Sequence, residues 1–311
     1  MRWELRLENV WDLEFSERNK MKHIIFDCDN TFGVKDCDVD DGLALLYLLG
    51  CKEAAKIHGI TATYGNNRLE VVYETIHRML KDLGREDIAV KRGGYEAGDY
   101  DSEAADYLAE MANRLQGQLS ILATGSLTNL QGAYERDAHF FEKVKEIVLM
   151  GGITEPLVFE KKVMDELNFS CDPLASCNVL KYGNNVSVIT GNHCLKVLFT
   201  KEEYKRELFS REEPIARYIR ERTDYWFGYN EADYGIKGFY NWDVTAAVYL
   251  MHPELFTEQR GRFAFSEEDL KTGYLRKTPE GMWQCNLPEI GDAEAFKRNI
   301  YDTWMKVKIP V

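Results

Sequence analysis

An aspartate-rich segment early in the chain carries the residues best suited to chemistry. From Asp27 to Asp41 the sequence is DCDNTFGVKDCDVDD, which holds six aspartates and one lysine in fifteen positions. Two carboxylates about 4 Å apart repel by about 4 kcal/mol at an effective dielectric constant of about 20, so several converging carboxylates need a cation. Because the donors are oxygens, the segment predicts a Ca²⁺ or Mg²⁺ site in preference to Zn²⁺. The alternative is an acidic surface loop in which Asp40 or Asp41 caps the following helix.

The elements that must position this segment alternate between apolar strands and amphipathic helices. Strands are predicted at 23–28, 56–64, 88–91, 119–124, 146–150 and 186–190, and helices at 41–49, 69–83, 103–115, 127–134 and 173–181. This alternation predicts an α/β fold with an open, mostly parallel sheet flanked by helices. Later residues favour helices at 201–208, 214–227, 244–250 and 293–307, with a weak hairpin at 262–285, which predicts a C-terminal helical lobe.

Length, charge and cysteine content narrow the classes of protein. The chain has 311 residues and a formal net charge of −13, which argues against nucleic-acid binding. No apolar run reaches the ~20 residues of a membrane crossing, and the charged N-terminus lacks the apolar region of a secretory signal. Seven cysteines without a C-x-x-C pair are typical of a reduced, cytoplasmic protein. We expect a single domain over residues 21–311, preceded by an N-terminal extension over residues 1–20.

Polar residues also follow the later predicted strands. In open α/β sheets the ligand lies beyond the carboxyl ends of the strands, so these residues are candidates for one shared site. The segments are GITATYGNN at 59–67, ATGSLTN at 123–129, IVLMGG at 147–152, ELN at 166–168 with DPLA at 172–175, and NWDVTA at 241–246.

Together these segments resemble, in order, the pattern of the nucleoside hydrolase family (the inosine–uridine-preferring group) from residue 23 to the C-terminal helix. Each segment alone is common, but five in the same order are specific. The segment FDCDNT at 26–31 also resembles the first motif of haloacid-dehalogenase-type phosphatases, in which one Asp is a nucleophile and another a general acid. That alternative needs a suitably placed lysine and a later acidic motif, and only its first motif is persuasive.

The resemblance to nucleoside hydrolases implies a Rossmann-like core and a calcium site. It assigns the calcium ligands to Asp29, Asp41, the carbonyl oxygen of Thr124, and Asp243. Asp29 would also take the proton from the attacking water. A cation at this place would orient that water and bind the ribose diol.

The same resemblance implies a ribose site and a base site. Asp40 and Asn168 would bind the 2′- and 3′-hydroxyls along with the ion, and Glu166 would hold the 5′-hydroxyl. Asn66 would face the sugar or the base, and Met150 would line the site. The substrate class implied is a ribonucleoside, which is hydrolysed at its N-glycosidic bond to ribose and free base.

The sequence departs from the family pattern at three places. The two Asp pairs are separated by the long segment 30–39 instead of a short Pro-Gly step, so that Asp38 is a possible substitute for Asp29 or Asp40. Residues 153–165 lack the Gly-Asn that commonly precedes the glutamate, which puts one 5′-hydroxyl contact in doubt. Many family members have a histidine acid directly before the last calcium aspartate, where this chain has Trp242.

The expected preference for purine bases depends on Trp242. An indole cannot protonate a leaving group, but it can stack on a purine and make the ring nitrogens easier to protonate by water, as in the purine-specific subgroup with Trp-Asp at this point. The neighbouring aromatic residues suit a base pocket, a mobile lid or simple helix packing (Tyr225, Trp226, Tyr229, Tyr234, Phe239 and Tyr240). We therefore expect a calcium-dependent, cytoplasmic ribonucleoside hydrolase for nucleoside salvage that favours purines and forms a homo-oligomer, dimer or tetramer. The alternative is a non-catalytic or regulatory nucleoside-binding protein of the same fold.

Overall fold

The computed structural model describes residues 21–310, so the expected extension over residues 1–20 lies outside the described part. Its centre is a nine-stranded sheet with the order β11-β10-β12-β8-β5-β4-β1-β2-β3. The strands expected from the sequence form its parallel part: β1 (Lys22–Cys28), β2 (Ala55–Ala62), β3 (Ala89–Arg92), β4 (Leu119–Ala123), β5 (Glu146–Met150) and β8 (Val186–Ile189). The expected α/β fold, with an open and mostly parallel sheet, is confirmed.

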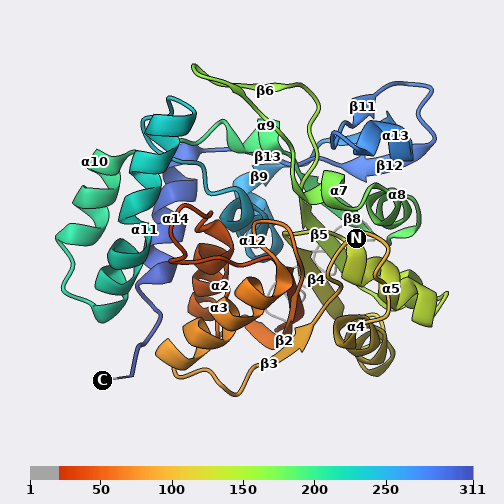
Figure 1. Ribbon diagram of the computed structural model, residues 1–311, viewed down its shortest axis with the longest axis horizontal. Coiled ribbons are helices and arrows are strands. Elements are labelled where there is room, and N and C mark those ends of the chain that lie inside the picture. Colours follow the sequence, from red (N-terminus) through yellow and green to blue (C-terminus); the bar gives the residue numbers. More distant parts are fainter. Residues whose placement is uncertain (1–20, 311) are drawn as a thin grey trace, which may run out of the picture.

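Helices cover both faces of this sheet, and each face has its own apolar core (Figure 1). One face is covered by α2 (Asp40–Gly50), α3 (Leu69–Asp82), α12 (Trp242–Met251) and α14 (Ala293–Trp304). The other is covered by α4 (Glu103–Arg114), α5 (Thr128–Arg136), α6 (Phe140–Lys143) and α8 (Pro173–Tyr182). Strands buried on both faces need continuous apolar runs, as in the sequence of β4, LSILA, where every residue is buried.

The order of the strands defines where a ligand can bind. From β1 the chain continues to β2 and β3 on one side, and β4 then pairs with the other side of β1. A crevice opens at such a reversal of strand order, beyond the carboxyl ends of the two strands. Asp29 follows β1 directly and Thr124 follows β4 directly, so the sheet brings these two residues to the same crevice.

The C-terminal part differs in detail from the sequence-based expectation. The weak hairpin at 262–285 is a pair of antiparallel strands, β10 (Arg260–Ala264) and β12 (Trp283–Asn286), and β12 extends the main sheet by pairing parallel to β8. The lobe is therefore not purely helical, because β11 (Arg276–Lys277), β9 (Phe256–Thr257) and β13 (Glu289–Ile290) also lie in it. Periodicity over a few residues does not reveal which distant strand edge such a segment will pair with.

The helical part of the lobe contains a long helix and a short irregular one. Helix α11 (Pro214–Asp233) continues for more than one turn beyond its expected end at residue 227. The helix expected at 201–208 consists of α10 (Lys201–Tyr204) followed by the π-helical turn η1 (Lys205–Phe209). The short elements β6 (Leu157–Val158), β7 (Val163–Met164), α7 (Asn168–Cys171), α9 (Gly191–Cys194), η2 (Pro253–Leu255) and α13 (Glu267–Leu270) complete the described chain.

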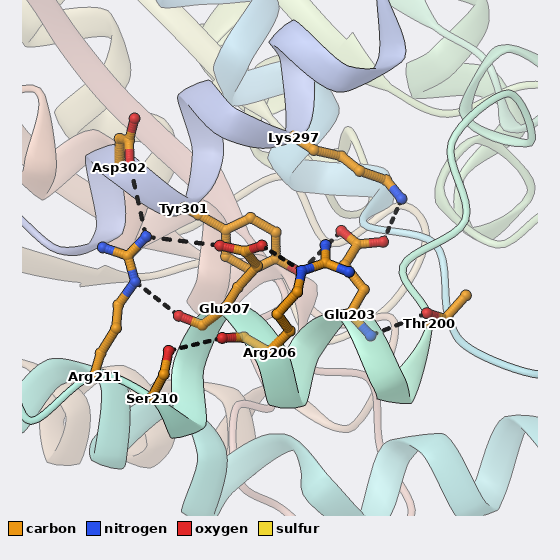
Figure 2. A network of polar contacts seen from close by, with 9 residues as sticks. All are labelled: Thr200, Glu203, Arg206, Glu207, Ser210, Arg211, Lys297, Tyr301 and Asp302. Carbon is orange, nitrogen blue, oxygen red and sulfur yellow. Dashed lines mark hydrogen bonds and ion pairs between the residues drawn. The ribbon is translucent and has the colours of Figure 1, made fainter.

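A network of polar contacts fastens this lobe to the C-terminal helix (Figure 2). Lys297 on α14 donates to Glu203 on α10 at 2.5 Å, and the Tyr301 hydroxyl donates to the same carboxylate at 3.2 Å. Because the Glu203 side chain is only 11% exposed, these two donors replace most of the water that its charge would otherwise bind. The network fixes α10 and η1 against α14, and α11 packs against η1.

The other global expectations concern cysteines and membranes. The seven cysteines are all free in the structure. In the part of the chain that the structure describes, no helix combines the length and the apolar character that a bilayer crossing requires.

Candidate active site

Four aspartates from two distant segments lie together at the crevice between β1 and β4. Oxygen atoms of Asp40, Asp41 and Asp243 all lie within 4.8 Å of one another. Asp29 is joined to this cluster by Asn66, whose amide nitrogen lies 3.3 Å from Asp29 Oδ1 and 3.4 Å from Asp41 Oδ2. The structure thus brings together the aspartates that the sequence analysis assigned to one site.

Helix starts position three of these aspartates. Asp40 and Asp41 are the first residues of α2, and Asp243 is the second residue of α12, which packs against α2. The backbone N–H of Asp243 donates to Asp40 Oδ2 at 3.0 Å. At the start of α2 the N-cap is Val39, and no side chain makes a capping hydrogen bond. The interpretation of Asp40 or Asp41 as a helix cap is therefore wrong, because neither carboxylate is used in that way.

The cluster is buried, and this raises the cost of its charge. The four side chains are at most 3% exposed, and no ion pair within residues 21–310 involves them. Burial raises the pKa of Asp29 to about 7, and it holds the pKa values of Asp41 and Asp243 well above their usual range. The charges of the neighbouring aspartates raise the pKa of Asp41 and Asp243 further.

The donor set fits a hard divalent cation. Several buried carboxylates are stable together when a cation occupies the space between them, and all the donors here are oxygens. The Thr124 hydroxyl donates to Asp41 Oδ1 at 2.7 Å, which fixes that carboxylate. The Thr124 carbonyl accepts one hydrogen bond, from Asn168 Nδ2 at 3.0 Å, and its second lone pair remains available to a ligand.

Asp29 is held rigidly behind the pocket. The backbone N–H of Asn66 donates to Asp29 Oδ2 at 2.5 Å. A Cβ atom on Gly65 would lie 2.0 Å from the same oxygen, so only glycine permits this close approach of the backbone. The loop after β2 therefore orients the carboxylate that the sequence analysis named as the base.

Most of the predicted residues line one cavity of about 370 Å³. They are Asp38, Asp40, Asn66, Thr124, Met150, Glu166, Asn168, Trp242 and Asp243. Asp29 and Asp41 lie behind its wall, where both contact Asn66.

Glu166 is held by three backbone N–H groups, those of Gly152, Phe169 and Ser170, at 2.8–3.0 Å. Burial nevertheless raises the pKa of Glu166 above its usual value. Asn168 Nδ2 donates to the carbonyls of Thr124 and Met150 and touches the Met150 sulfur at 3.3 Å. Its Oδ1 is thus left as an acceptor.

The long segment 30–39 forms part of the cavity wall. The hydroxyl of Tyr225 on α11 can donate to the carbonyl of Val34, at 2.8 Å, and to that of Cys37, at 2.9 Å. This contact attaches the segment to the helix. Asp36, Cys37 and Asp38 line the cavity as a result. Asp38 accepts hydrogen bonds from the backbone of Val39 and Asp40 at 2.6 and 3.3 Å, so it lies beside Asp40.

Aromatic residues on α11 and close to it in the structure form another part of the cavity wall. The rings of Trp226 and Tyr229 are stacked, with centroids 4.7 Å apart and an interplanar angle of 11°. Both line the cavity together with Tyr234 and Trp242, whereas Phe239 is fully buried in the core. The ring of Tyr240 lies 5.1 Å from that of Trp242 and supports it.

Sequence reasoning missed several parts of this cavity, including the segment around β6 and β7 (Ile153, Leu157, Met164, Asp165 and Leu167) and Gly191. Asn230 lines it from α11, and Asp36 and Cys37 line it from the long segment. Asn230 lies one residue after Tyr229, which the sequence analysis did name, but helix periodicity alone does not tell which face of α11 meets the sheet. Nothing local to the long segment indicates that it folds back onto α11.

The comparisons with known proteins agree with this geometry. A family model described as "Inosine-uridine preferring nucleoside hydrolase" matches residues 24–297. A "Uridine nucleosidase 1" of Arabidopsis thaliana is 25% identical over 285 residues, covering 82% of this chain and 84% of the relative. A "Pyrimidine-specific ribonucleoside hydrolase RihA" of Klebsiella pneumoniae is 26% identical over 255 residues, covering 71% of this chain and 80% of the relative.

Two solved structures share the fold. A plant nucleoside hydrolase has a TM-score of 0.80 at 22% identity and covers 91% of this chain and 99% of its own. A purine-preferring ribonucleoside hydrolase from Gardnerella vaginalis has a TM-score of 0.79 at 21% identity and covers 92% and 99%. The family match spans the parallel strands, the aspartate cluster and α12. It therefore excludes the haloacid-dehalogenase-type phosphatase family, which the segment at 26–31 also resembles. The chain belongs to the inosine–uridine preferring nucleoside hydrolase family.

Proposed function

We propose that the chain hydrolyses the N-glycosidic bond of ribonucleosides with calcium as its cofactor, and that it favours purine bases. The observation that carries this proposal is the convergence of Asp40, Asp41 and Asp243, from segments far apart in the chain, at the cavity that Asn168 also lines. A ribose diol has two adjacent hydroxyls, and this convergence offers it acceptors on both sides.

Asp29, Asp41, the Thr124 carbonyl and Asp243 would hold the calcium ion. Bound there, calcium would neutralise the buried carboxylates and give the ribose diol and the attacking water a fixed place. Asp29 accepts the proton of the water, and a bound cation would keep its carboxylate ionised and ready to act as a base. Asp38 is the alternative base, since it lies beside Asp40 in the same wall.

The remaining residues bind the substrate. Asp40 and Asn168 Oδ1 accept hydrogen bonds from the 2′- and 3′-hydroxyls, and Glu166 accepts one from the 5′-hydroxyl. Asn66 and Met150 contact the sugar or the base from the side of the sheet. These contacts hold the sugar while the bond from C1′ to the base nitrogen breaks and positive charge develops on the ribose, which the surrounding carboxylates stabilise.

The preference for purines rests on Trp242 and the aromatic wall of α11. A bicyclic base offers more stacking area to Trp242 than a pyrimidine does, and stacking can raise the basicity of the purine ring. The relatives named above include a uridine nucleosidase and a pyrimidine-specific hydrolase, so uridine belongs in the same assay.

The test incubates purified protein and calcium with inosine, adenosine, guanosine, uridine and cytidine, and measures released ribose. We expect ribose from all or some of them, with larger kcat/KM for the purine ribosides. Nucleoside binding without any released ribose would instead identify a non-catalytic binding protein. A larger kcat/KM for uridine would overturn the purine preference while leaving the hydrolase intact.

A further inference from the structure

A second hollow lies at the opposite end of the sheet from the aspartate cluster. It has a volume of about 380 Å³ and adjoins Val186, the first residue of β8, whereas the cluster lies at the carboxyl ends of β1 and β4. The hollow forms because β12 pairs with β8 only through Asn286 and Ser187, so residues 283–285 run past the start of β8. No residue assigned to the cation, the ribose or the base lines it.

The lining of this hollow is basic, although the chain as a whole is acidic. The lining includes Arg260 and Arg262 and no aspartate or glutamate, in a chain whose formal net charge is −13. The other lining residues are neutral: Gly183, Asn185, Val186, Gly261, Gln284, Cys285 and Asn286. Two cations with no carboxylate in the same lining produce a local positive potential, which attracts anions.

Strands β10 and β12 place the polar side chains of the hollow on one face of the sheet. Arg260 and Arg262 are two residues apart on β10, so their side chains point to the same face, with Cα atoms about 7 Å apart. In the antiparallel pair they lie opposite Asn286 and Gln284. Both guanidinium groups can therefore reach one ligand group that lies between them.

The hydrogen-bond donors of the hollow are available to a ligand. Within residues 21–310, no hydrogen bond or ion pair involves the guanidinium of Arg262 or the side-chain amides of Asn185 and Gln284. Arg260 has one ion pair, with Glu258 at 3.6 Å, and its side chain is 74% exposed. Such an exposed pair is weak, so Arg260 can turn towards an anion in the hollow.

The floor of the hollow is buried and held by hydrogen bonds. Cys285 and Asn286 are each 3% exposed. Asn286 Nδ2 donates to the Ser187 hydroxyl at 3.0 Å and to the Tyr249 hydroxyl at 2.9 Å, and its Oδ1 accepts from the backbone N–H of Gln259 at 3.1 Å. These bonds fix β12 between β8 and β10, so the backbone that carries the two arginines is ordered before a ligand binds.

The donor set matches a phosphate monoester. Guanidinium groups bind oxyanions through paired N–H donors, and a phosphate monoester carries a charge of about −1.5 to −2 at pH 7. Arg260 and Arg262 balance that charge, and the amides of Asn185 and Gln284 can donate to the remaining oxygens. The volume of about 380 Å³ falls within the range of small-molecule sites, about 300–1,000 Å³, and leaves room for the organic part of the ester.

We propose that the hollow between β10, β12 and the turn before β8 binds the phosphate group of a small phosphate monoester, with Arg260 and Arg262 as the residues that hold it. The inference goes beyond the proposed function and does not depend on it, because the two cavities share no lining residue.

The test titrates the full chain, loaded with calcium, with ribose 5-phosphate and measures the Kd by isothermal titration calorimetry. We expect one ribose 5-phosphate per chain, with a Kd that rises with the concentration of NaCl because the contact is between opposite charges. Succinate, a dianion of different shape, is the comparison ligand and should bind more weakly, because its two carboxylates do not present the oxygens of one phosphate to both arginines.

Substitutions then assign the site. Arg262→Gln removes a guanidinium that has no partner within residues 21–310, so we expect the fold and the Tm to be kept. The Kd for ribose 5-phosphate should rise by about tenfold or more, as for the loss of a hydrogen bond to a charged group. The matched control is Arg114→Gln, which removes the same charge at the exposed end of α4, before the start of β4, and should leave the Kd unchanged.

The cation of the aspartate cluster is the other place at which a phosphate could bind, and Asp243→Asn tests it. We expect this variant to keep the affinity for ribose 5-phosphate. If Asp243→Asn weakens binding and Arg262→Gln does not, the phosphate binds at the cluster and the inference is wrong. Equal affinities of Arg262→Gln and the unsubstituted chain, or succinate binding as tightly as ribose 5-phosphate, would also overturn it. A protein that binds ribose 5-phosphate through Arg262 but hydrolyses no ribonucleoside would refute only the proposed function.

Discussion

Trp242 is the residue on which the proposed purine preference depends, and the structure gives it a defined setting. It is the first residue of α12, its ring lies against Tyr240, and the next residue is Asp243 of the carboxylate cluster. The tryptophan is therefore held next to the cation site and faces the same cavity. The Trp242 ring packs against the core on one side and lines the cavity, so it is placed where a bound base could contact it.

We predict that Trp242→Ala lowers kcat/KM for purine ribosides by about 10- to 100-fold, because base–aromatic stacking is worth about 1–3 kcal/mol. Hydrolysis of p-nitrophenyl riboside, whose leaving group needs no proton, should fall much less. Trp242→His restores an acid at this place and should shift relative activity towards uridine. Equal losses on every substrate would mean that the side chain only supports the fold.

Asn168 and Asp40 are the proposed acceptors for the two ribose hydroxyls, and a deoxyribonucleoside tests this role. Asn168 has its nitrogen fixed by two backbone carbonyls, so its oxygen cannot rotate away when a hydroxyl is missing. An unfilled acceptor of this kind, together with Asp40, should reduce kcat/KM for 2′-deoxyinosine by about 10⁴ relative to inosine. Comparable values for the two nucleosides, measured at saturating calcium, would remove the diol role from both residues.

At the scale of elements, the long segment 30–39 depends on α11 for its position. A single hydroxyl, that of Tyr225, lies within hydrogen-bonding distance of two carbonyls of the segment, and the Arg222 side chain packs against Gly33. The segment in turn carries Asp36 and Asp38 into the cavity wall. A change on α11 can therefore alter the cavity without touching any residue that binds the ribose.

We expect Tyr225→Phe to lower the free energy of unfolding by about 1 kcal/mol, the net value of one intramolecular hydrogen bond. The Tyr225→Phe variant should raise KM more than it lowers kcat, because part of the free energy of substrate binding is then used to order segment 30–39. The matched control is Tyr182→Phe, at a tyrosine that is 52% exposed, which should change neither quantity. Urea denaturation and steady-state kinetics measure both. An unchanged KM in a destabilised Tyr225→Phe protein would show that the segment does not contribute to binding.

At the scale of the whole molecule, the aspartate cluster joins segments that are far apart in the chain. Asp40 and Asp41 begin α2, whereas Asp243 lies on α12. The two helices pack against each other in the apolar core on one face of the sheet. A cation at the cluster would thus stabilise a contact between segments that are about 200 residues apart, as their numbers show. Binding that occurs only in the folded state adds to the free energy of unfolding.

We predict that chelation lowers the Tm and that this loss grows with pH. The pKa of Asp29 in the folded protein is raised to about 7 and that of Asp41 is raised well above its usual value, so without a cation the folded state binds more protons than the unfolded state between about pH 4 and pH 7. Stability conferred by this protonation is present at low pH and is lost as the pH rises through the folded pKa values.

We expect calcium to remove that loss, because a bound divalent cation favours the ionised carboxylates. The difference in Tm between calcium-loaded and chelated protein should therefore be small at pH 5 and large at pH 8, and taking the difference cancels other titrating groups such as His58, whose pKa burial lowers to about 4. Differential scanning fluorimetry at several pH values measures it. A Tm difference that does not change with pH would place the cation elsewhere, and recovery with zinc but not calcium would contradict the assignment of the ion.

The sequence by itself determined the parallel sheet, the strand ends at which chemistry is possible, and the oxygen character of the cation site. These properties are local: strands buried on both faces need apolar runs, and residues such as Asp29 and Thr124 follow such runs directly. The family pattern then connected Asp243 and Asn168 to the same site. Only the tertiary structure decided that segment 30–39 folds onto Tyr225, that Asn230 faces the cavity, and that the strands at 260–286 extend the main sheet. Each of these depends on a contact between segments far apart in the chain, and the periodicity of one segment does not specify its distant partner.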